Sequence, residues 1–166
     1  MQELIQSIRA ELGDSRTGLP EELFLFVSEL TPMINVDLLV CNDQNQTLLT
    51  WRDDVFYGPG WHVPGGIIRF KERASHRIDQ VAQIELGAEV EYEETPLRVT
   101  EIMNPTRDIR GHFISLLYRC KLKTELSEKT QFVKKHPENN HWAWFSTCPE
   151  DLIYQQEMYR EFINPK

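Results

Sequence analysis

The sequence lacks the features that mark several large classes of protein. Its three cysteines, Cys41, Cys120 and Cys148, form no CxxC pair and no zinc-ligand pattern, which predicts reduced thiols. No apolar run approaches the roughly 18 residues of a membrane span, and no signal-type apolar core lies near its beginning. Positive charge is also scarce, because 18 Lys and Arg stand against 26 Asp and Glu, for a net charge of -8. We therefore expect a cytoplasmic protein with no nucleic-acid or membrane partner.

The remaining composition is typical of a globular protein. The chain has 166 residues, of which 40% are hydrophobic and 27% are charged. A chain of this size can bury a sizeable core, and it falls within the usual range of one domain. We expect a single domain over residues 1–166, with a helical extension at 1–28, a core at 30–146 and a C-terminal helix at 149–163.

Hydrophobic periodicity predicts an α+β protein. Helical spacing occupies residues 2–12 before Gly13, a second short helix runs from Pro20 to about Val27, and further helices are predicted at 74–86 and after Pro149. The predicted strands are 33–42, 46–52, 61–64, 97–103, 112–122 and 141–146, with a polar loop at 124–140. The first two strands are predicted to form a hairpin, and Gly65 and Gly66 a turn. The order indicates a mixed sheet with helices on both sides.

A strand, a double glycine, a loop and an amphipathic helix follow one another in GWHVPGGIIRFKERASHRIDQVAQIELGAEV, residues 60–90. This order resembles the signature of the Nudix hydrolase family: Gly, five residues, Glu, seven residues, then Arg-Glu-hydrophobic-x-Glu-Glu-x-Gly-hydrophobic. The residues at matching positions are Gly66, Glu72, Glu85, Gly87 and Ala88.

Three positions depart from that signature. Gln80 replaces its arginine, and Val81 and Ile84 replace two of its glutamates. Positions 81, 84 and 85 share one helix face, so a complete signature would present three carboxylates to divalent ions. Here only Glu85 remains. The retained Glu72 is interpreted as structural, at the junction between loop and helix.

The chain is more closely similar to one branch of the family, the GDP-mannose mannosyl hydrolases. The likeness runs from about Leu30 to Phe145, through the segments LTPMINVDLLV, TLLTWR, WHVPGG, IELG and GHFISLLYRCKL. Enzymes of this branch attack the anomeric carbon of the sugar, and the nucleoside diphosphate leaves intact. The resemblance implies a Nudix-type α/β/α sandwich, a homodimer, and a hydrolase of nucleoside diphosphate sugars that uses Mg²⁺, with Mn²⁺ as a substitute.

The resemblance also implies a metal site and two catalytic groups. The metal would be held by the carbonyl of Gly65, by Glu85 and by Glu138 in the late loop. Arg52 would neutralise the charge that develops on the departing diphosphate, for which its planar fork is suited. Asp37 lies in an apolar strand, where a carboxylate is costly unless it is paired. It either binds sugar or base, or pairs with a neighbouring backbone group or arginine.

The catalytic base is harder to place. The branch uses a histidine in the late loop, but its position here aligns with Asn139, which cannot accept a proton at neutral pH. His136 and His141 flank that position, and a histidine pKa of about 6.5 suits a base. We favour His141, because it adjoins the strand HWAWF.

Substrate contacts are predicted in two loops. Phe56 and Tyr57, between Arg52 and the double glycine, are candidates for stacking on a sugar or base. Arg69 can replace an arginine that the branch places at position 67, and Arg107 can form part of a cationic rim with Asp108 and Arg110. The alternative for that rim is a plain charged loop.

Two other functions stay open from the sequence. An ordinary Nudix pyrophosphohydrolase would cut between the phosphates with unusual ligands. A binding module would hold a nucleotide sugar without turnover.

Overall fold

The protein was analysed as a computed structural model that describes residues 1–133 and 136–163. Residues 134 and 135 of the predicted loop, and residues 164–166 of the predicted domain, lie outside the described part. The elements are α1 (Gln2–Glu11), η1 (Ser15–Thr17), α2 (Glu21–Leu30), β1 (Met33–Val40), β2 (Thr47–Arg52), β3 (Gly60–His62), β4 (Gly65–Ile67), α3 (Ala74–Val81), η2 (Ala82–Leu86), β5 (Val90–Tyr92), β6 (Arg98–Met103), β7 (His112–Leu122), η3 (Glu128–Thr130), β8 (Trp142–Phe145), η4 (Tyr154–Tyr159) and α4 (Arg160–Ile163).

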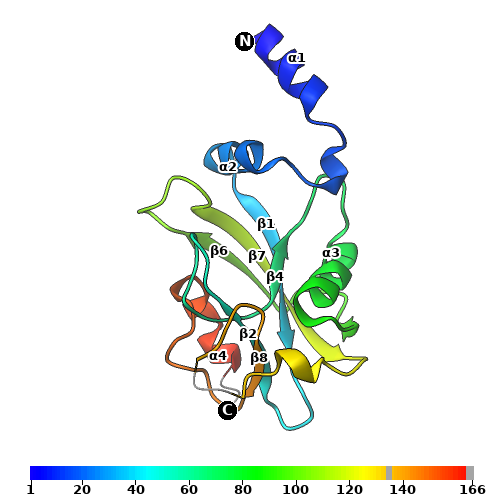
Figure 1. Cartoon of the computed structure of the whole chain (residues 1–166), viewed down its shortest axis with the longest axis vertical. Helices are drawn as coiled ribbons and strands as arrows, with labels where there is room; N and C mark the ends of the chain where they lie inside the picture. The colour runs from blue at the N-terminus through cyan, green and yellow to red at the C-terminus, as the bar shows by residue number, and fades with distance from the viewer. Residues whose placement is uncertain (134–135, 164–166) are drawn as a thin grey trace.

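Two sheets form the centre of the molecule (Figure 1). The five-stranded sheet has the order β4-β1-β7-β5, and β6 pairs with β7 beside β5. β1 and β7 are parallel, whereas the other pairs of this sheet are antiparallel. The second sheet has the antiparallel order β3-β2-β8. The predicted α+β class with a mixed sheet is confirmed.

The predicted hairpin of the first two strands is wrong. Only a single bridge joins Cys41 to Thr47, and beyond it β1 and β2 enter different sheets. Leu38, Leu39 and Val40 of β1, which alternate between the two faces of the strand, are all buried. A strand that is buried on both faces is typical of the centre of a sheet, where it needs a partner on each side. β1 takes β7 and β4 as those partners, which leaves β2 to pair elsewhere.

The predicted turn at the two glycines is also wrong. Gly65 and Gly66 begin β4, which pairs antiparallel with β1 in the register Asp37 with Gly65 and Val36 with Gly66. A Cβ atom at Gly65 would clash with Oδ1 of Asp37, and one at Gly66 would lie 2.7 Å from Cγ2 of Val81. The two glycines therefore allow β1 and α3 to pack closely against the backbone of β4. Glycine in a strand often marks such a close approach.

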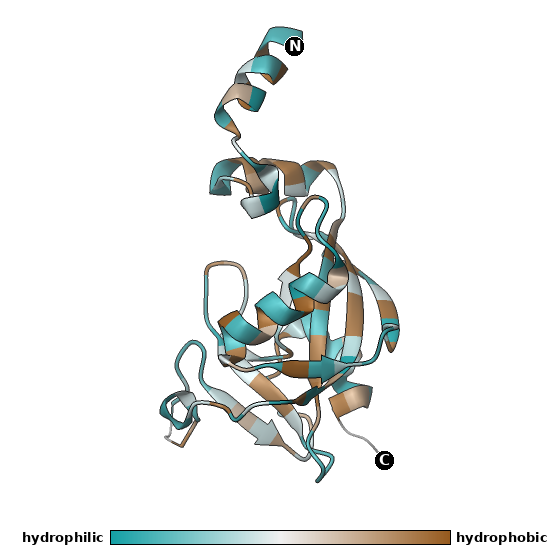
Figure 2. Cartoon of the chain, turned by 90° about the vertical axis from the view of Figure 1, so that its right-hand side faces the viewer, coloured by the Kyte–Doolittle hydropathy of each residue, from teal (hydrophilic) through white to brown (hydrophobic). Residues whose placement is uncertain are grey.

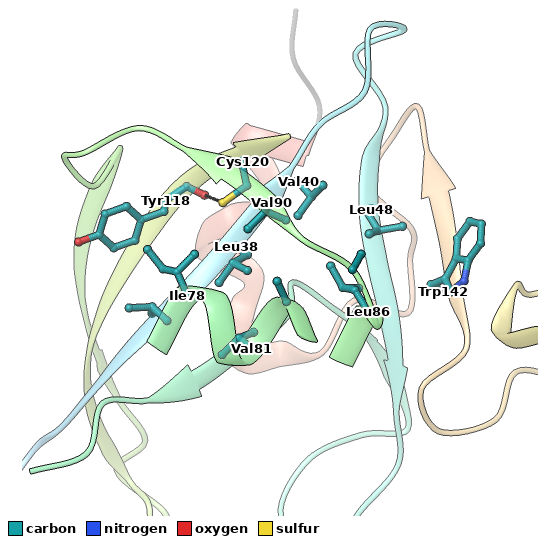
Figure 3. Close-up of a cluster of buried hydrophobic side chains, with 13 residues drawn as sticks. Leu38, Val40, Leu48, Ile78, Val81, Leu86, Val90, Tyr118, Cys120 and Trp142 are labelled. Carbon is teal, nitrogen blue, oxygen red and sulfur yellow. Dashed lines mark hydrogen bonds between the residues drawn. The ribbon is translucent and has the colours of Figure 1, made fainter. Parts of the chain in front are cut away.

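α3 and η2 together span the helix predicted at 74–86, and they cover one face of the five-stranded sheet. Ile78, Val81 and Leu86 of this helical segment pack in one buried cluster with Leu38 of β1 and Leu48 of β2 (Figure 3). The next residue, Leu39, belongs instead to a second core. Successive strand residues face opposite sides, so β1 contributes to both cores. The second core also contains Leu49, Trp61, Val63, Leu117, Leu152, Tyr159 and Ile163.

The terminal segments differ in how closely they pack. α1 projects away from the body in Figures 1 and 2 and has no buried residue. α2 continues to Leu30, beyond the predicted end near Val27, and it lies above β1 (Figure 1). The helix predicted after Pro149 begins only at Tyr154, as η4 and then α4. None of the described helices is long and apolar enough to cross a membrane.

Candidate functional site

A cavity of about 1050 Å³ opens beside β1, β4 and the end of β2. It brings together most of the residues that the sequence nominated for the site. The nominated residues that line it are Asp37, Arg52, Tyr57, Gly65, Arg69, Glu85 and Arg107. Phe56, Glu138 and His141 are not among the lining residues. The N-terminal segment adds a wall that the sequence did not predict, through Leu19, Phe24 and Val27.

Glu85 lies in η2, near the end of the helical segment that Gly87 closes in the left-handed conformation. Its side chain is 21% exposed. The carboxylate accepts two long hydrogen bonds, at 3.3 Å from the amide of Gly65 and at 3.4 Å from the hydroxyl of Thr50. Burial, with a smaller contribution from Asp37, raises the pKa of Glu85 to about 7, against the opposing effects of the Gly65 amide and of Arg52. Glu85 is thus a desolvated carboxylate with weak partners.

The other two signature positions on this helix face do not contribute polar groups. Val81 is 3% exposed and lies beside Gly66. Ile84 is 70% exposed and therefore faces solvent. Within the described part of the chain, Glu85 is the one carboxylate that α3 and η2 bring to the cavity.

Thr50 and His62 complete a buried group around Glu85 that sequence reasoning missed. Nε2 of His62 lies 3.0 Å from the Thr50 hydroxyl and 3.9 Å from Glu85. Burial, together with the charge of Arg52, lowers the pKa of His62 to about 4. The ring is therefore neutral at pH 7, so Nδ1–H donates to the carbonyl of Val63 and Nε2 accepts from Thr50.

The Thr50 hydroxyl has one proton and two acceptors, His62 and Glu85. It can satisfy only one of them at a time, so Glu85 keeps an oxygen that a ligand can use. Both Thr50 and His62 lie in segments that carry the family resemblance. Only the pairing of β2 with β3, in the register Thr50 with His62, shows that they meet.

Asp37 is buried in β1 and is held by three side-chain donors. Oδ1 accepts from Asn35 at 2.9 Å, and Oδ2 accepts from Tyr159 at 2.6 Å and from Ser115. Burial raises the pKa of Asp37 to about 6, and the three hydrogen bonds oppose that rise. The donors come from β1, β7 and η4, and none is an arginine or a backbone amide. A carboxylate has about four acceptor positions, so one remains for a ligand.

Arg52 stands between Glu85 and the loop that follows β2. It forms an ion pair with Asp54, and its guanidinium lies 4.7 Å from the ring centre of Tyr57. Its charge lowers the pKa values of both Glu85 and His62. Arg52 is therefore close enough to Glu85 to act on it electrostatically, and its predicted role toward a diphosphate stays a prediction.

The late loop does not bring its two nominated residues to the cavity. Glu138 is exposed, and its amide donates to Nδ1 of His141 at 3.0 Å. Asn139 occupies the cavity lining instead, because its side chain pairs with both the amide and the carbonyl of Asp53, at 2.6 Å and 2.9 Å. In this arrangement the metal role of Glu138 and the base role of His141 gain no support from position.

Glu72 behaves as the structural residue that the sequence predicted. Its carboxylate accepts from the amide of Arg69 at 2.8 Å, from the guanidinium of Arg77 at 2.8 and 2.9 Å, and lies 2.9 Å from Nδ1 of His76. Hydrogen bonds from the Arg69 amide and Arg77 hold the pKa of Glu72 low, although burial by itself acts the other way. It fixes the loop before α3, and Arg69 itself lines the cavity beside Gly18.

Glu85 can supply one protein ligand to a single divalent ion whose coordination the substrate and water complete. Among residues 1–133 and 136–163, no three His, Cys, Asp or Glu side chains gather into a group that could hold a metal. Mg²⁺ binds through one or two carboxylates, keeps several waters and takes substrate phosphates as further ligands. Glu85, with its two weakly bonded oxygens, suits that role.

Sequence comparison decides the family. Residues 31–162 match the model of the NUDIX domain, which is most of the chain. The chain belongs to the Nudix family. Comparison with curated protein sequences finds no significant match.

Solved structures of Nudix proteins share the fold. A MutT Nudix hydrolase from Burkholderia pseudomallei is 18% identical with a TM-score of 0.61, covering 81% of this chain and 99% of its own. A protein described as a possible diadenosine tetraphosphate hydrolase from Jonesia denitrificans is 19% identical, with a TM-score of 0.62 and coverage of 80% and 92%. A UDP-X diphosphatase is 16% identical, with a TM-score of 0.58, and covers 98% of this Nudix chain and 74% of its own.

Proposed function

We propose that this Nudix protein is a Mg²⁺-dependent hydrolase of nucleoside diphosphate sugars that cleaves the glycosyl C–O bond. The observation that carries the proposal is the single carboxylate, Glu85, on the helix face where the family signature has three. Attack on phosphorus commonly uses several metal ions to activate water and to stabilise charge on the phosphates. Departure of an intact diphosphate needs only one ion on the leaving group, which one carboxylate can hold.

Glu85 would hold the ion, and Arg52 would bind the diphosphate beside it. The ion, when bound, supplies positive charge to the leaving group. Arg52 adds hydrogen bonds that strengthen as negative charge develops on the diphosphate oxygens. Its ion pair with Asp54 and its contact with Tyr57 orient the guanidinium before the ligand arrives.

Asp37 would orient the sugar or the attacking water. It lines the cavity with one acceptor position left after its bonds to Asn35, Tyr159 and Ser115. With a pKa of about 6 it is mostly ionised at pH 7 and can accept a hydrogen bond from a hydroxyl group or from water. His141 could serve as the base only after the late loop moves toward the cavity.

Cleavage between the phosphates is the second candidate. The UDP-X diphosphatase covers 98% of this chain, and an ADP-ribose pyrophosphatase from Streptococcus suis covers 80% with a TM-score of 0.54. The activities in those descriptions concern those proteins. They favour a nucleoside diphosphate compound as the substrate of this chain, with Glu85 and Arg52 used on a bridging phosphate.

Oxygen-18 water separates the two reactions. The purified protein is incubated with Mg²⁺ and a panel of nucleoside diphosphate sugars, and the products are analysed by mass spectrometry. Label in the free sugar is the expected result, whereas label in a phosphate product would support the second candidate. Ligand-dependent thermal stabilisation without any turnover would instead indicate a binding module.

A further inference from the structure

Arg107 and Arg110, in the loop between β6 and β7, form an unpaired cationic group at the cavity. Arg107 donates from Nη2 to the carbonyl of Phe56 at 2.7 Å, but its Nη1 is buried without a partner. Nε of Arg110 is also buried without a partner. Within the described part of the chain, neither arginine has a carboxylate at ion-pair distance. Arg52, by contrast, is paired with Asp54.

The aromatic rings beside these arginines provide cation–π contacts, which do not satisfy the N–H groups that are buried without partners. Arg110 lies 4.8 Å from the ring centre of Phe56, 5.1 Å from Tyr57 and 5.5 Å from Phe24. Arg107 lies 5.3 Å from the Tyr57 ring. A stacked guanidinium still directs its N–H groups outward in its own plane, where they suit an oxyanion. Stacking therefore positions the two arginines but leaves their buried N–H groups without acceptors.

The backbone fixes this loop before any ligand binds. Asn104 and Gly111 close it through an amide-to-carbonyl bond of 2.7 Å, and Gly111 approaches the Arg107 carbonyl too closely for a side chain. Arg110 has a φ of 53°, a left-handed conformation that non-glycine residues seldom adopt. Its amide donates to the hydroxyl of Ser28 in α2 at 3.0 Å. The anchor thus comes from the segment that precedes the Nudix match at residue 31.

The position of the group indicates which part of a ligand would reach it. Tyr57 makes cation–π contacts with Arg52 and also with Arg107 and Arg110. Arg52 acts electrostatically on Glu85, where the proposed function places the diphosphate. A ligand that holds its diphosphate at Glu85 and Arg52 would extend past Tyr57 to the other two arginines.

We propose that Arg107 and Arg110 form a subsite for a second anionic group of the substrate, a carboxylate or phosphate carried by its sugar or its nucleoside. The subsite rests on the proposed function, because that function places the diphosphate at Glu85 and Arg52. The chain has a net charge of -8, so this cationic group is a local feature and not part of a generally basic surface.

Paired ligands that differ by one anionic group test the subsite. Calorimetry measures the affinity for each ligand, in a chelator that prevents turnover. The pairs are GDP-mannose with GDP-mannuronate, and ADP-ribose with ADP-ribose 2′-phosphate. The natural protein is expected to bind the anionic member of one pair about tenfold more tightly. The first pair reports a carboxylate on the sugar, and the second a phosphate on the nucleoside.

Variants assign the preference to the two arginines. The double change R107Q/R110Q is expected to reduce it to about one, while affinity for the neutral member changes less than about threefold. R110K keeps the charge without the planar fork and should retain part of the preference. R98Q, at an exposed arginine of β6 outside the cavity lining, is the matched control and should change nothing.

The failures can be told apart. Equal affinity within both pairs, or equal loss for both members in the double variant, overturns the subsite alone. Binding with the expected preference but no turnover in Mg²⁺ overturns the proposed function alone. If the natural protein binds none of the four ligands in the chelator, the subsite fails, and the turnover assay in Mg²⁺ decides the proposed function separately.

Discussion

The cavity has a mostly buried inner end, at Asp37, Glu85 and His62, and a half-buried outer end, at Arg107 and Arg110. The two ends differ in charge and in how their side chains are held. Asp37, Glu85 and His62, at the inner end, are carried by strands and by η2, and burial shifts all three pKa values. At the outer end Arg107 and Arg110 are carried by a loop. Groups that take part in a reaction need fixed geometry, whereas binding groups on loops can vary among relatives. Under the proposed function we expect the reaction at the inner end and substrate selection at the outer end.

The largest expected effect is loss of turnover at the inner end. Glu85→Gln removes the charge that would hold the ion under the proposed function, so we expect kcat to fall by about 1,000-fold or more. Initial rates with saturating Mg²⁺ measure this change. Glu91→Gln, at an exposed glutamate of β5, is the matched control and should leave the rate within twofold of the natural protein, roughly experimental error. Unchanged turnover in Glu85→Gln would remove the basis of the proposed function.

Arg52 should show the next largest effect. Arg52→Lys keeps a positive charge but loses the fork that contacts two phosphate oxygens, so kcat should fall by about 30-fold. Because the interaction strengthens in the transition state, KM should change much less than kcat. Steady-state kinetics separate the two constants. A rise in KM with unchanged kcat would instead assign Arg52 to ground-state binding.

Gly65→Ala tests whether the inner end is rigid. The added methyl group would overlap the Asp37 carboxylate, so we expect a loss of about 2 kcal/mol in the free energy of unfolding. Gly13→Ala is the control, because nothing lies within 4 Å of the added atom and only the positive φ is penalised. Urea unfolding measures both. Equal, small losses would show that β4 and β1 can move apart freely.

The pH dependence of stability isolates the buried charge of Glu85. Its pKa is raised to about 7, so the folded protein holds the proton more tightly than the unfolded chain. Stability from this group is therefore present below pH 4.5, the ordinary value, and is lost as pH rises to about 7. His62, with its lowered pKa, acts in the opposite direction between about 4 and 6.5.

A comparison with Glu85→Gln removes the contribution of His62, because both proteins share it. Without metal, the variant should gain thermal stability relative to the natural protein as pH rises from 4.5 to 8, on the order of 5 °C. Thermal denaturation across this range, in a chelating buffer, measures the difference. A constant difference would mean that the folded protein does not perturb the pKa of Glu85.

The smallest effect is expected at His141. The sequence nominates it as the base, whereas the structure places it outside the cavity lining. His141→Ala should therefore reduce kcat by less than about threefold, compared with the 100-fold or more that loss of a general base causes. A large loss would show that the late loop moves during the reaction and brings His141 to the cavity.

The helix at 74–86 and the strand at 112–122 were predictable because their patterns are local. Ile78, Val81 and Leu86 recur at helical spacing, and the family spacing located Glu85 without any knowledge of its neighbours. The hairpin of β1 and β2 was predicted wrongly, since a turn at residues 42–45 is compatible with strands that separate after it. Local pattern cannot tell which partner a fully buried strand will choose.

By itself, the sequence determined the main helices and the longer strands, the family spacing and the loss of two signature carboxylates, because each depends on residues close together in the chain. Only the tertiary structure decided that Tyr159 holds Asp37, that Thr50 and His62 surround Glu85, and that Ser28 anchors Arg110. Those contacts join residues far apart in the chain. Their partners are set by sheet register and by the packing of α2 and η4, which no short stretch of sequence encodes.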